Sequence, residues 1–563
     1  MQRIRISGVL LLAGLVVACG DPEGEAPVDH EAAQALFEDW DRKDAPGCTA
    51  AAEREGERVF DGAWGMADLE HEIELERDSR LEAGSVSKQF TTALVMKLVE
   101  DGELSLDEDV REHIPELPDY GTPITLRHLI HHTSGLRDWG SVAAISGWGR
   151  GERSHEHAHV LDILSRQEAL NFEPGEYYSY SNSGYNLMVI LIERVTGEDF
   201  AELSRERLLE PAGMDDTRWR TDYTDVMPGR SAAYSGEADD EEFQINRPIE
   251  HVHGNAALTT TVGDLLRWNR ALEEKRFGEA FDKHMHRQGE LNNGREIDYA
   301  AALRIDEDHG QRQIGHTGAT SGYRAYLSRF PDQDLSVAIL CNVTGVDIGD
   351  KGSELAGILL GDAAEEEDDA LPEPVDMSTE RLEARTGIWA DERNHQPLRL
   401  VRDGNRLRIP PEDEDDEEDE GQAVTPVDED RFHVEDAEHE LVFEAAEEDE
   451  RESLRIRRDD HDEERLHPVA GPDEEAMDPS DYLGYFVSDE AETALQVSLE
   501  EDELVAERRP DREFHLEPVY EDAFRADGLG LIRFRRDEDG QVVALSYSNP
   551  RVYDLRFELV DGE

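Results

Sequence analysis

The chain changes its pattern of apolar and polar residues near position 370. Residues 31–362 alternate between helical spacing, as in 90–98, and strand-like runs, as in 326–330. Beyond residue 375, short alternating runs such as 398–402 and 531–535 are separated by Asp-Gly turns, which is typical of strands joined by hairpins. The pattern predicts a mixed α/β region followed by an all-β region.

The all-β region contains an internal repeat. Residues 424–432 and 516–524 share Pro-Val, Glu-Asp and Phe at matching positions, and Gly387-Ile-Trp resembles Gly484-Tyr-Phe upstream. The two matches lie almost the same distance apart along the chain. We therefore predict two copies of one β-module, although one composite barrel would also fit. The predicted modules cover 376–470 and 471–563.

Acidic stretches mark the predicted boundaries. Residues 363–375 are acidic and contain prolines, so they are predicted to be a linker. The acidic run 412–420 interrupts the first β-module, and we interpret it as a solvated loop rather than a binding site.

The N-terminus has the layout of a signal peptide. Two arginines precede a short apolar run at 9–17, which is too short to cross a membrane as a helix. The run ends at Ala18-Cys19, and residues 15–19 resemble the lipoprotein cleavage box of bacteria. This resemblance implies a signal peptide at 1–18 and a diacylglycerol on Cys19.

Lipidation would attach the protein to the membrane through the tether 19–30. The expected location is the cell envelope, on the periplasmic face or the cell surface. Gly20 in the position after the cysteine would permit sorting to the outer membrane. Ordinary secretion with cleavage nearby is the alternative.

Composition narrows the function classes. Among 563 residues, 134 are acidic and 57 are basic, so the formal net charge is −77. This charge repels phosphate backbones and argues against nucleic-acid binding. Only six basic residues are lysines, and acid-rich, lysine-poor surfaces are typical of proteins that work in concentrated salt, which screens self-repulsion. The acids are spread along the whole chain, which favours salt adaptation over a single acidic tail.

Three cysteines exclude a disulfide-rich scaffold. Cys48 and Cys341 each lie in a short apolar run, and we expect two buried free thiols at these positions. The compartment of a secreted protein would also allow a disulfide between them.

The first motif with chemical potential is Gly-Ser-Val-Ser-Lys at 84–88. A helical pattern follows it, so Ser85 and Lys88 share one face of a helix. A serine becomes a nucleophile when a neighbouring base removes its proton, and a buried lysine with a lowered pKa can do so. Alone, the motif would also fit a helix-capping serine beside an exposed lysine.

Two further motifs follow. Tyr180-Ser-Asn182 precedes an apolar helix at 187–195, and a tyrosine hydroxyl near a lysine can move protons. His316-Thr-Gly318 lies next to a strand pattern, and a glycine-bordered strand can bring backbone N–H groups close to a substrate carbonyl. Taken separately, the two motifs would fit an aromatic loop and a glycine-rich hairpin.

Together, the three motifs resemble the serine β-lactamase and penicillin-binding protein superfamily, in its class C, esterase and D-aminopeptidase branch. The segments 124–136 and 258–265 resemble further stretches of that branch. The resemblance covers about residues 31–362. It implies an α/β (α+β) β-lactamase/transpeptidase-like fold, with an antiparallel sheet flanked by helices and a helical lobe. The modules after residue 375 resemble the lipocalin-like or barrel domains of some relatives.

The resemblance also implies roles for individual residues. Ser85 is the expected nucleophile of an acyl-enzyme, with Lys88 and Tyr180 sharing the general-base work. Asn182 is expected to bond to Lys88 or to the substrate amide. The remaining residues expected to line the substrate and oxyanion site are His316, Thr317, Gly318 and Ala319, where the N–H groups of Ser85 and Ala319 would form the oxyanion hole.

One position departs from the family pattern. His316 stands where β-lactamases and cell-wall peptidases usually have the lysine expected to hold a substrate carboxylate. Histidine is mostly neutral at pH 7, although a shifted pKa would change that. We therefore favour an ester, an amide or a D-amino-acid peptide as substrate. A β-lactamase or DD-carboxypeptidase acting on β-lactams or peptidoglycan stems is the alternative.

Other functions compete with the interpretation as a serine hydrolase. His128, His131 and His132 have helical metal-site spacing without a Glu or Cys partner pattern, so we expect neither a metal nor a cofactor. The G-x-S-x-G elbow of α/β-hydrolases is absent. A non-catalytic peptide- or cell-wall-binding lipoprotein is the rival from another class, but the catalytic set is complete. The expected partner is a small-molecule or peptide substrate, and the oligomeric state stays open.

Overall fold

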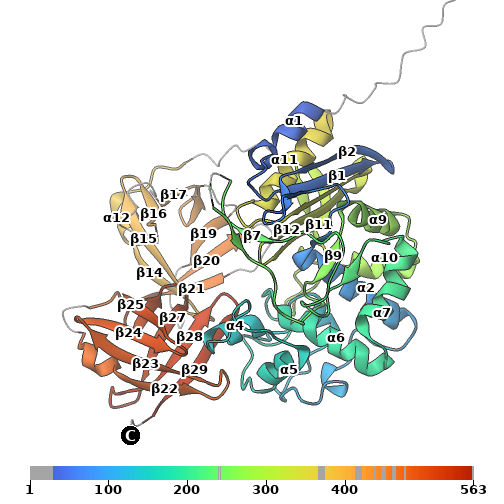
Figure 1. The fold of residues 1–563 in the computed structure, drawn as a ribbon. Coiled ribbons are helices and arrows are strands. Elements are labelled where there is room, and N and C mark those ends of the chain that lie inside the picture. Colours follow the sequence, from blue (N-terminus) through green and yellow to red (C-terminus); the bar gives the residue numbers. More distant parts are fainter. Residues whose placement is uncertain are drawn as a thin grey trace, which may run out of the picture.

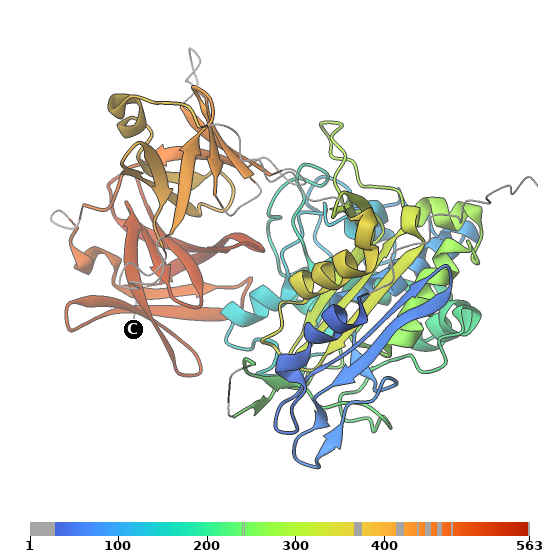
Figure 2. The same ribbon diagram turned by 90° about the horizontal axis from the view of Figure 1, so that it is seen from above.

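A computed structural model describes residues 29–238, 240, 242–364, 374–411, 421–435, 439–444, 452–458, 464–473 and 477–560. An α/β region with one main sheet is followed by two closed β-barrels (Figure 1). Figure 2 shows both barrels on the same side of the α/β region. The predicted fold class is confirmed: a β-lactamase-like fold of sheets and helices precedes two closed antiparallel barrels.

The main sheet has six strands in the order β10-β11-β12-β13-β1-β2, all antiparallel to their neighbours. The first two strands of the chain therefore complete a sheet whose other strands come nearly 250 residues later. The bounds are β1 Cys48–Arg54, β2 Glu57–Trp64, β10 Arg304–Asp308, β11 Gln311–Thr320, β12 Tyr323–Phe330 and β13 Leu335–Cys341.

Strand β13 is buried along its whole length because helices cover both faces of the sheet. Val337 and Ile339 pack with α1 and α11 on one face, whereas Ala338 and Leu340 belong to the larger core on the other face, with α2 and α9. The helices of the α/β region are α1 His30–Ala35, α2 Lys88–Glu100, α3 Leu126–Ile130, α4 Trp139–Ile145, α5 His157–Ser165, α6 Asn182–Thr196, α7 Phe200–Ser204, α8 Glu210–Ala212, α9 Val262–Glu273, α10 Glu279–Met285 and α11 Ile348–Leu360.

Short elements connect these helices and strands. They include the π-helix Arg205–Leu209 between α7 and α8. The 3-10 helices are η1 Glu38–Trp40, η2 Gly84–Ser87, η3 Val110–Glu112, η5 Pro331–Gln333, η6 Gly361–Ala363 and η7 Pro479–Tyr482. The short strands are β3 Met66–Asp68, β4 Ile73–Glu74, β5 Leu81–Glu82, β6 Arg218–Trp219, β7 Tyr234–Ser235, β8 Gln244–Ile245 and β9 Leu258–Thr260.

The two barrels have the same meander topology, with sequential neighbours paired and the last strand closing on the first. The repeated Pro-Val-x-Glu-Asp-x-Phe segments occupy the same hairpin in both barrels, β17–β18 and β25–β26. Helix α12 Thr379–Glu383 precedes the first barrel. The strands are β14 Gly387–Asp391, β15 Pro397–Asp403, β16 Arg406–Ile409, β17 Gln422–Pro426, β18 Arg431–Val434, β19 His439–Glu444, β20 Ser453–Arg458, β21 Glu464–Val469, β22 Gly484–Ser488, β23 Thr493–Glu500, β24 Glu503–Arg508, β25 Arg512–Tyr520, β26 Ala523–Ala526, β27 Gly530–Arg536, β28 Val542–Asn549 and β29 Val552–Val560.

The second barrel packs directly on the α/β region near α4 (Figure 1). Arg137 Nη1 lies 2.6 Å from Glu490 Oε2, and both side chains are almost completely buried. The same carboxylate accepts the backbone N–H of Glu168 at 2.7 Å, and Arg137 Nη2 donates to the carbonyl of Tyr553 at 3.1 Å. A buried, hydrogen-bonded ion pair therefore fixes the docking of this barrel.

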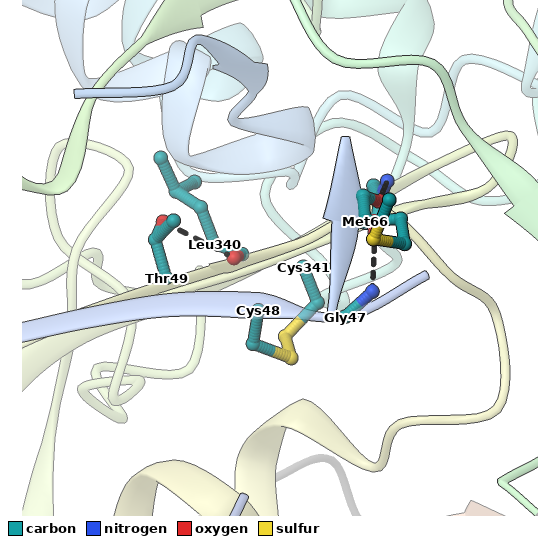
Figure 3. Close-up of a disulfide and its surroundings, with 7 residues drawn as sticks. Gly47, Cys48, Thr49, Met66, Leu340 and Cys341 are labelled. Carbon is teal, nitrogen blue, oxygen red and sulfur yellow. Dashed lines mark hydrogen bonds between the residues drawn. A yellow bond between two sulfur atoms is a disulfide. The ribbon is translucent and has the colours of Figure 1, made fainter. Parts of the chain in front are cut away.

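Cys48 and Cys341 form a disulfide, so the expectation of two free thiols is wrong. The residues are directly opposite in the antiparallel pair β1–β13, and their side chains lie on one face of the sheet (Figure 3). The neighbouring residue Thr49 bonds to the carbonyl of Leu340 at 3.4 Å. The sheet register, which the sequence does not show, brings the two sulfur atoms together.

Several predictions lie outside the described residues. The signal peptide 1–18, Cys19, most of the tether 19–30 and most of the linker 363–375 belong to this group, as does the acidic run 412–420. In the described part of the chain, none of the helices combines the length and apolar character that a membrane crossing needs.

Candidate active site

The 3-10 helix η2, which carries Ser85, packs against the part of strand β11 that does not pair with β10. Strand β10 pairs with β11 only as far as Gly315, so His316 and the following residues face η2 instead. A Cβ on Gly84 would lie 2.5 Å from Ala319 N, and one on Gly318 would lie 2.1 Å from Ala83 O. Only glycine allows this approach, which places the backbone of Ser85 next to that of Ala319.

Lys88 lies one turn after Ser85, at the start of α2, and is completely buried. Its Nζ atom lies 3.0 Å from Ser85 Oγ, 2.9 Å from Asn182 Oδ1 and 2.9 Å from the carbonyl oxygen of Asn255. Burial lowers the pKa of Lys88 well below its usual value, with smaller contributions from Arg150 and Arg551.

The two nearest acceptors determine how a neutral Lys88 amine is oriented. Its two N–H groups donate to Asn182 and to the Asn255 carbonyl, so its lone pair is left for the Ser85 hydroxyl. This is the arrangement that a general base needs when it accepts a proton from a serine nucleophile.

Tyr180 lies directly beside this pair. Lys88 Nζ is 4.8 Å from the Tyr180 ring centroid, and the His132 ring packs on the tyrosine at 4.2 Å between centroids. Burial raises the pKa of Tyr180 to about 12, while the nearby Ser85 hydroxyl opposes this shift. The phenol is therefore protonated at neutral pH, and its buried oxygen has no hydrogen-bond partner among the described residues.

The surroundings of His316 favour the neutral form of its imidazole ring. Its Nδ1–H donates to the carbonyl of Thr317, and its Nε2 lies 3.0 Å from the hydroxyl of Tyr299. That hydroxyl lies 3.2 Å from Nε2 of His132, whose Nδ1 accepts the N–H of Ser181. Burial lowers the pKa of His316 to about 3, so it supplies no positive charge at neutral pH.

Asn182 is held by a residue that the motifs did not indicate. Its backbone N–H donates to Asp138 Oδ2 at 2.7 Å, while Asp138 Oδ1 accepts N–H groups of Gly140 and Ser141 at the start of α4. Asp138 therefore connects the first turns of α4 and α6 and holds Asn182 in a position from which it contacts Lys88. In the structure, Asn182 Oδ1 accepts a hydrogen bond from Lys88 Nζ at 2.9 Å.

The structure brings the predicted site residues together, and it adds others. Ser85, Lys88, Tyr180 and Asn182 converge, with 316–319 of β11 alongside Ser85. Thr317 and Ala319 are exposed, whereas His316 and Gly318 are buried. Residues outside the three motifs also act on the site: Asp138, Asn255, Tyr299, His132 and Arg551.

The histidines considered for a metal face different partners. His128 Nδ1 accepts the N–H of Thr125, His131 Nε2 lies 3.3 Å from the carbonyl of Arg287, and His132 faces Tyr299. Within the described ranges, no group of three or more His, Cys, Asp and Glu side chains is arranged to hold a metal ion.

Comparison with known proteins shows to which family this chain belongs. A family model described as Beta-lactamase matches residues 32–357, which is more than half of the chain. The chain belongs to the beta-lactamase family. In this member of the family, the fold brings Lys88 Nζ within 3.0 Å of Ser85 Oγ.

Curated proteins that are similar to this chain include D-aminopeptidases. The enzyme of Brucella anthropi is 28% identical over 322 residues, which cover 57% of this chain and 60% of the relative. The enzyme of Brucella ovis is 28% identical over 319 residues, covering 56% and 60%. The match thus spans 60% of the length of these relatives.

Two solved structures share the fold. The octameric penicillin-binding protein homologue from Pyrococcus abyssi matches 86% of this chain and 99% of its own, with a TM-score of 0.52 and 19% identity. A D-stereospecific amidohydrolase from Streptomyces sp. matches 58% and 98%, with a TM-score of 0.50 and 22% identity. At these identities, the likeness concerns the fold alone.

Proposed function

We propose that this protein is a serine hydrolase that cleaves an ester, an amide or a D-amino-acid peptide through an acyl-enzyme at Ser85. The carrying observation is the buried Lys88 amine, whose Nζ lies 3.0 Å from Ser85 Oγ and 2.9 Å from each of two further acceptors, Asn182 Oδ1 and the Asn255 carbonyl. The D-aminopeptidase relatives favour D-configured amides within this range.

The residues divide the reaction into two steps. Ser85 Oγ loses its proton to Lys88 Nζ and attacks the substrate carbonyl, whose oxygen is stabilised by the N–H groups of Ser85 and Ala319. The C–N or C–O bond then breaks, and the leaving group takes a proton from Lys88 directly or through the Tyr180 hydroxyl. Water attacks the acyl-enzyme by the same route and releases the acid.

Covalent labelling tests this proposal. A fluorescent fluorophosphonate in molar salt should label the wild type and Ser87→Ala, which retains the nucleophile, but not Ser85→Ala. Equal labelling of the wild type and Ser85→Ala would show that another serine is the nucleophile. A folded wild type that takes no label would support the non-catalytic binding lipoprotein instead.

We also propose an envelope location through a lipid on Cys19. The pattern of residues 1–19 supports it, and a disulfide such as Cys48–Cys341 persists in the oxidising compartments that secreted proteins reach. Cys19→Ala should remove the acyl mass increment and move the protein into the soluble fraction. Unchanged membrane association of that variant would contradict lipidation.

Adaptation to concentrated salt is the third part of the proposal. The net charge of −77 destabilises the folded state through repulsion, and salt screens this repulsion over distances beyond about 3 Å at 1 M. We expect the melting temperature to climb with NaCl or KCl up to molar concentrations. A melting temperature that stays constant across this range of salt concentrations would rule the adaptation out.

A further inference from the structure

The second barrel delivers an arginine to the catalytic site. Arg551 lies in the turn between β28 and β29, and its backbone carbonyl accepts the N–H of Asp138 at 3.2 Å and Asn171 Nδ2 at 3.1 Å. Its guanidinium carbon lies 5.2 Å from the ring centroid of Tyr180. The turn is therefore fixed through its backbone, while the side chain extends over a catalytic residue.

Among the described residues, Arg551 has no carboxylate partner. The side chain is exposed, and no carboxylate in the described part of the chain lies within 4.0 Å of the guanidinium. Asp138, whose charge also acts on Lys88 and Tyr180, is occupied by the N–H groups of Asn182, Gly140 and Ser141. Two other arginines of the same barrel, Arg533 and Arg535, pair with Asp554 instead.

Arg551 places a positive charge beside the catalytic residues of a strongly acidic protein. Burial is the main cause of the lowered pKa of Lys88 and of the raised pKa of Tyr180, and Arg551 contributes to the first shift and opposes the second. Arg150, which also acts on Lys88, is paired with Glu250. A positive charge at a site attracts and orients a ligand of the opposite charge. Because burial lowers the pKa of His316 to about 3, this attraction does not come from the position where β-lactamases and cell-wall peptidases usually have lysine.

We propose that Arg551 is a specificity-determining residue that binds a carboxylate of the substrate next to the bond cleaved at Ser85. The inference rests on the proposed hydrolase function and narrows its substrate class to anionic esters, amides or peptides. The planar guanidinium can bind a carboxylate through two parallel hydrogen bonds. A free ammonium group at the same place would be repelled, so the second barrel acts as part of the substrate site.

Two matched substrate pairs test the proposal. Mono-p-nitrophenyl glutarate is compared with its methyl ester, which places the charge on the acyl side of the scissile bond. N-acetyl-D-Ala-D-Ala is compared with its C-terminal amide, which places the charge on the leaving group. We expect the wild type to have a higher kcat/KM for the carboxylate member of at least one pair.

Substitutions of Arg551 should change that preference. Arg551→Gln should lower the ratio of kcat/KM between the two members by about 10–100-fold, mainly through KM, and Arg551→Lys should retain part of the ratio. Using the ratio cancels any effect of the substitution on Lys88, since both members depend on the same base. The matched control is Arg556→Gln, an exposed arginine of β29 paired with Glu558, which should leave the ratio unchanged.

Two results would overturn the inference: no preference for the carboxylate member of either pair in the wild type, or an unchanged ratio in Arg551→Gln. Failure of the proposed function has a different signature. In that case, neither member of a pair would be hydrolysed in a Ser85-dependent manner, and fluorophosphonate would not label the wild type.

Discussion

Replacing Lys88 by alanine should lower kcat/KM by about 10²–10⁴-fold, which is the usual contribution of a general base. Lys88→Arg should be equally impaired, because a guanidinium keeps the positive charge but cannot accept a proton at any usable pH. The expected losses are measured with the ester on which the wild type is most active. Lys97→Arg, in the last turn of the same helix, is the matched control and should retain activity, because a guanidinium can still pair with Glu100.

The dependence of kcat/KM on pH tests the role of Lys88 as general base independently. Activity requires the neutral amine, so kcat/KM should rise with pH through the pKa of Lys88 and then level off, and this rise should occur well below pH 10.5. The plateau should continue toward the pKa of Tyr180, about 12. A Lys88→Arg variant with wild-type turnover, or an acid limb near pH 10.5, would contradict the role of Lys88.

Glu490→Ala is expected to destabilise the protein by about 3–5 kcal/mol, because it leaves the buried guanidinium of Arg137 without a counter-charge. The remaining acceptors of Arg137, Gln167 Oε1 and the Tyr553 carbonyl, are neutral. The loss is measured by urea denaturation at fixed salt, on the transition that separates the second barrel from the α/β region.

The matched control removes an exposed acid of the same barrel. Glu558 pairs with Arg556, and more than half of each side chain is exposed, so Glu558→Ala should change stability by less than about 1 kcal/mol. Equal effects of Glu490→Ala and Glu558→Ala would show that the buried pair does not carry the docking of the barrel.

The sequence predicted those parts of the site that lie close together along the chain. Ser85 and Lys88 are one helical turn apart, and Tyr180 and Asn182 lie on either side of the start of α6, so local patterns were sufficient. The strand predicted at 326–330 is the core of β12, and the alternating runs after residue 375 became barrel strands. The spacing of apolar residues predicts these elements because at least one face of each is buried in a core.

Contacts between distant segments could not be predicted. Arg551 meets Asn171 across 380 residues of sequence, and only the docking of the second barrel brings them together. The same limit explains the wrong expectation for Cys48 and Cys341, since their apolar runs indicated burial but not the pairing of β1 with β13. The protonation of His316 also depends on its burial in the folded site and on the charge of Lys88, which lies more than 200 positions earlier in the chain.

The disulfide Cys48–Cys341 turns most of the α/β region into a covalent ring, since it spans 293 residues of sequence. Both halves of the site, Ser85 and Lys88 on one side and His316 on the other, lie within that ring. A protease that cuts one exposed loop between the two cysteines would open the ring without releasing a fragment. The nicked protein would keep its mass on a non-reducing gel, and only a reductant would separate the nucleophile from the strand beside it.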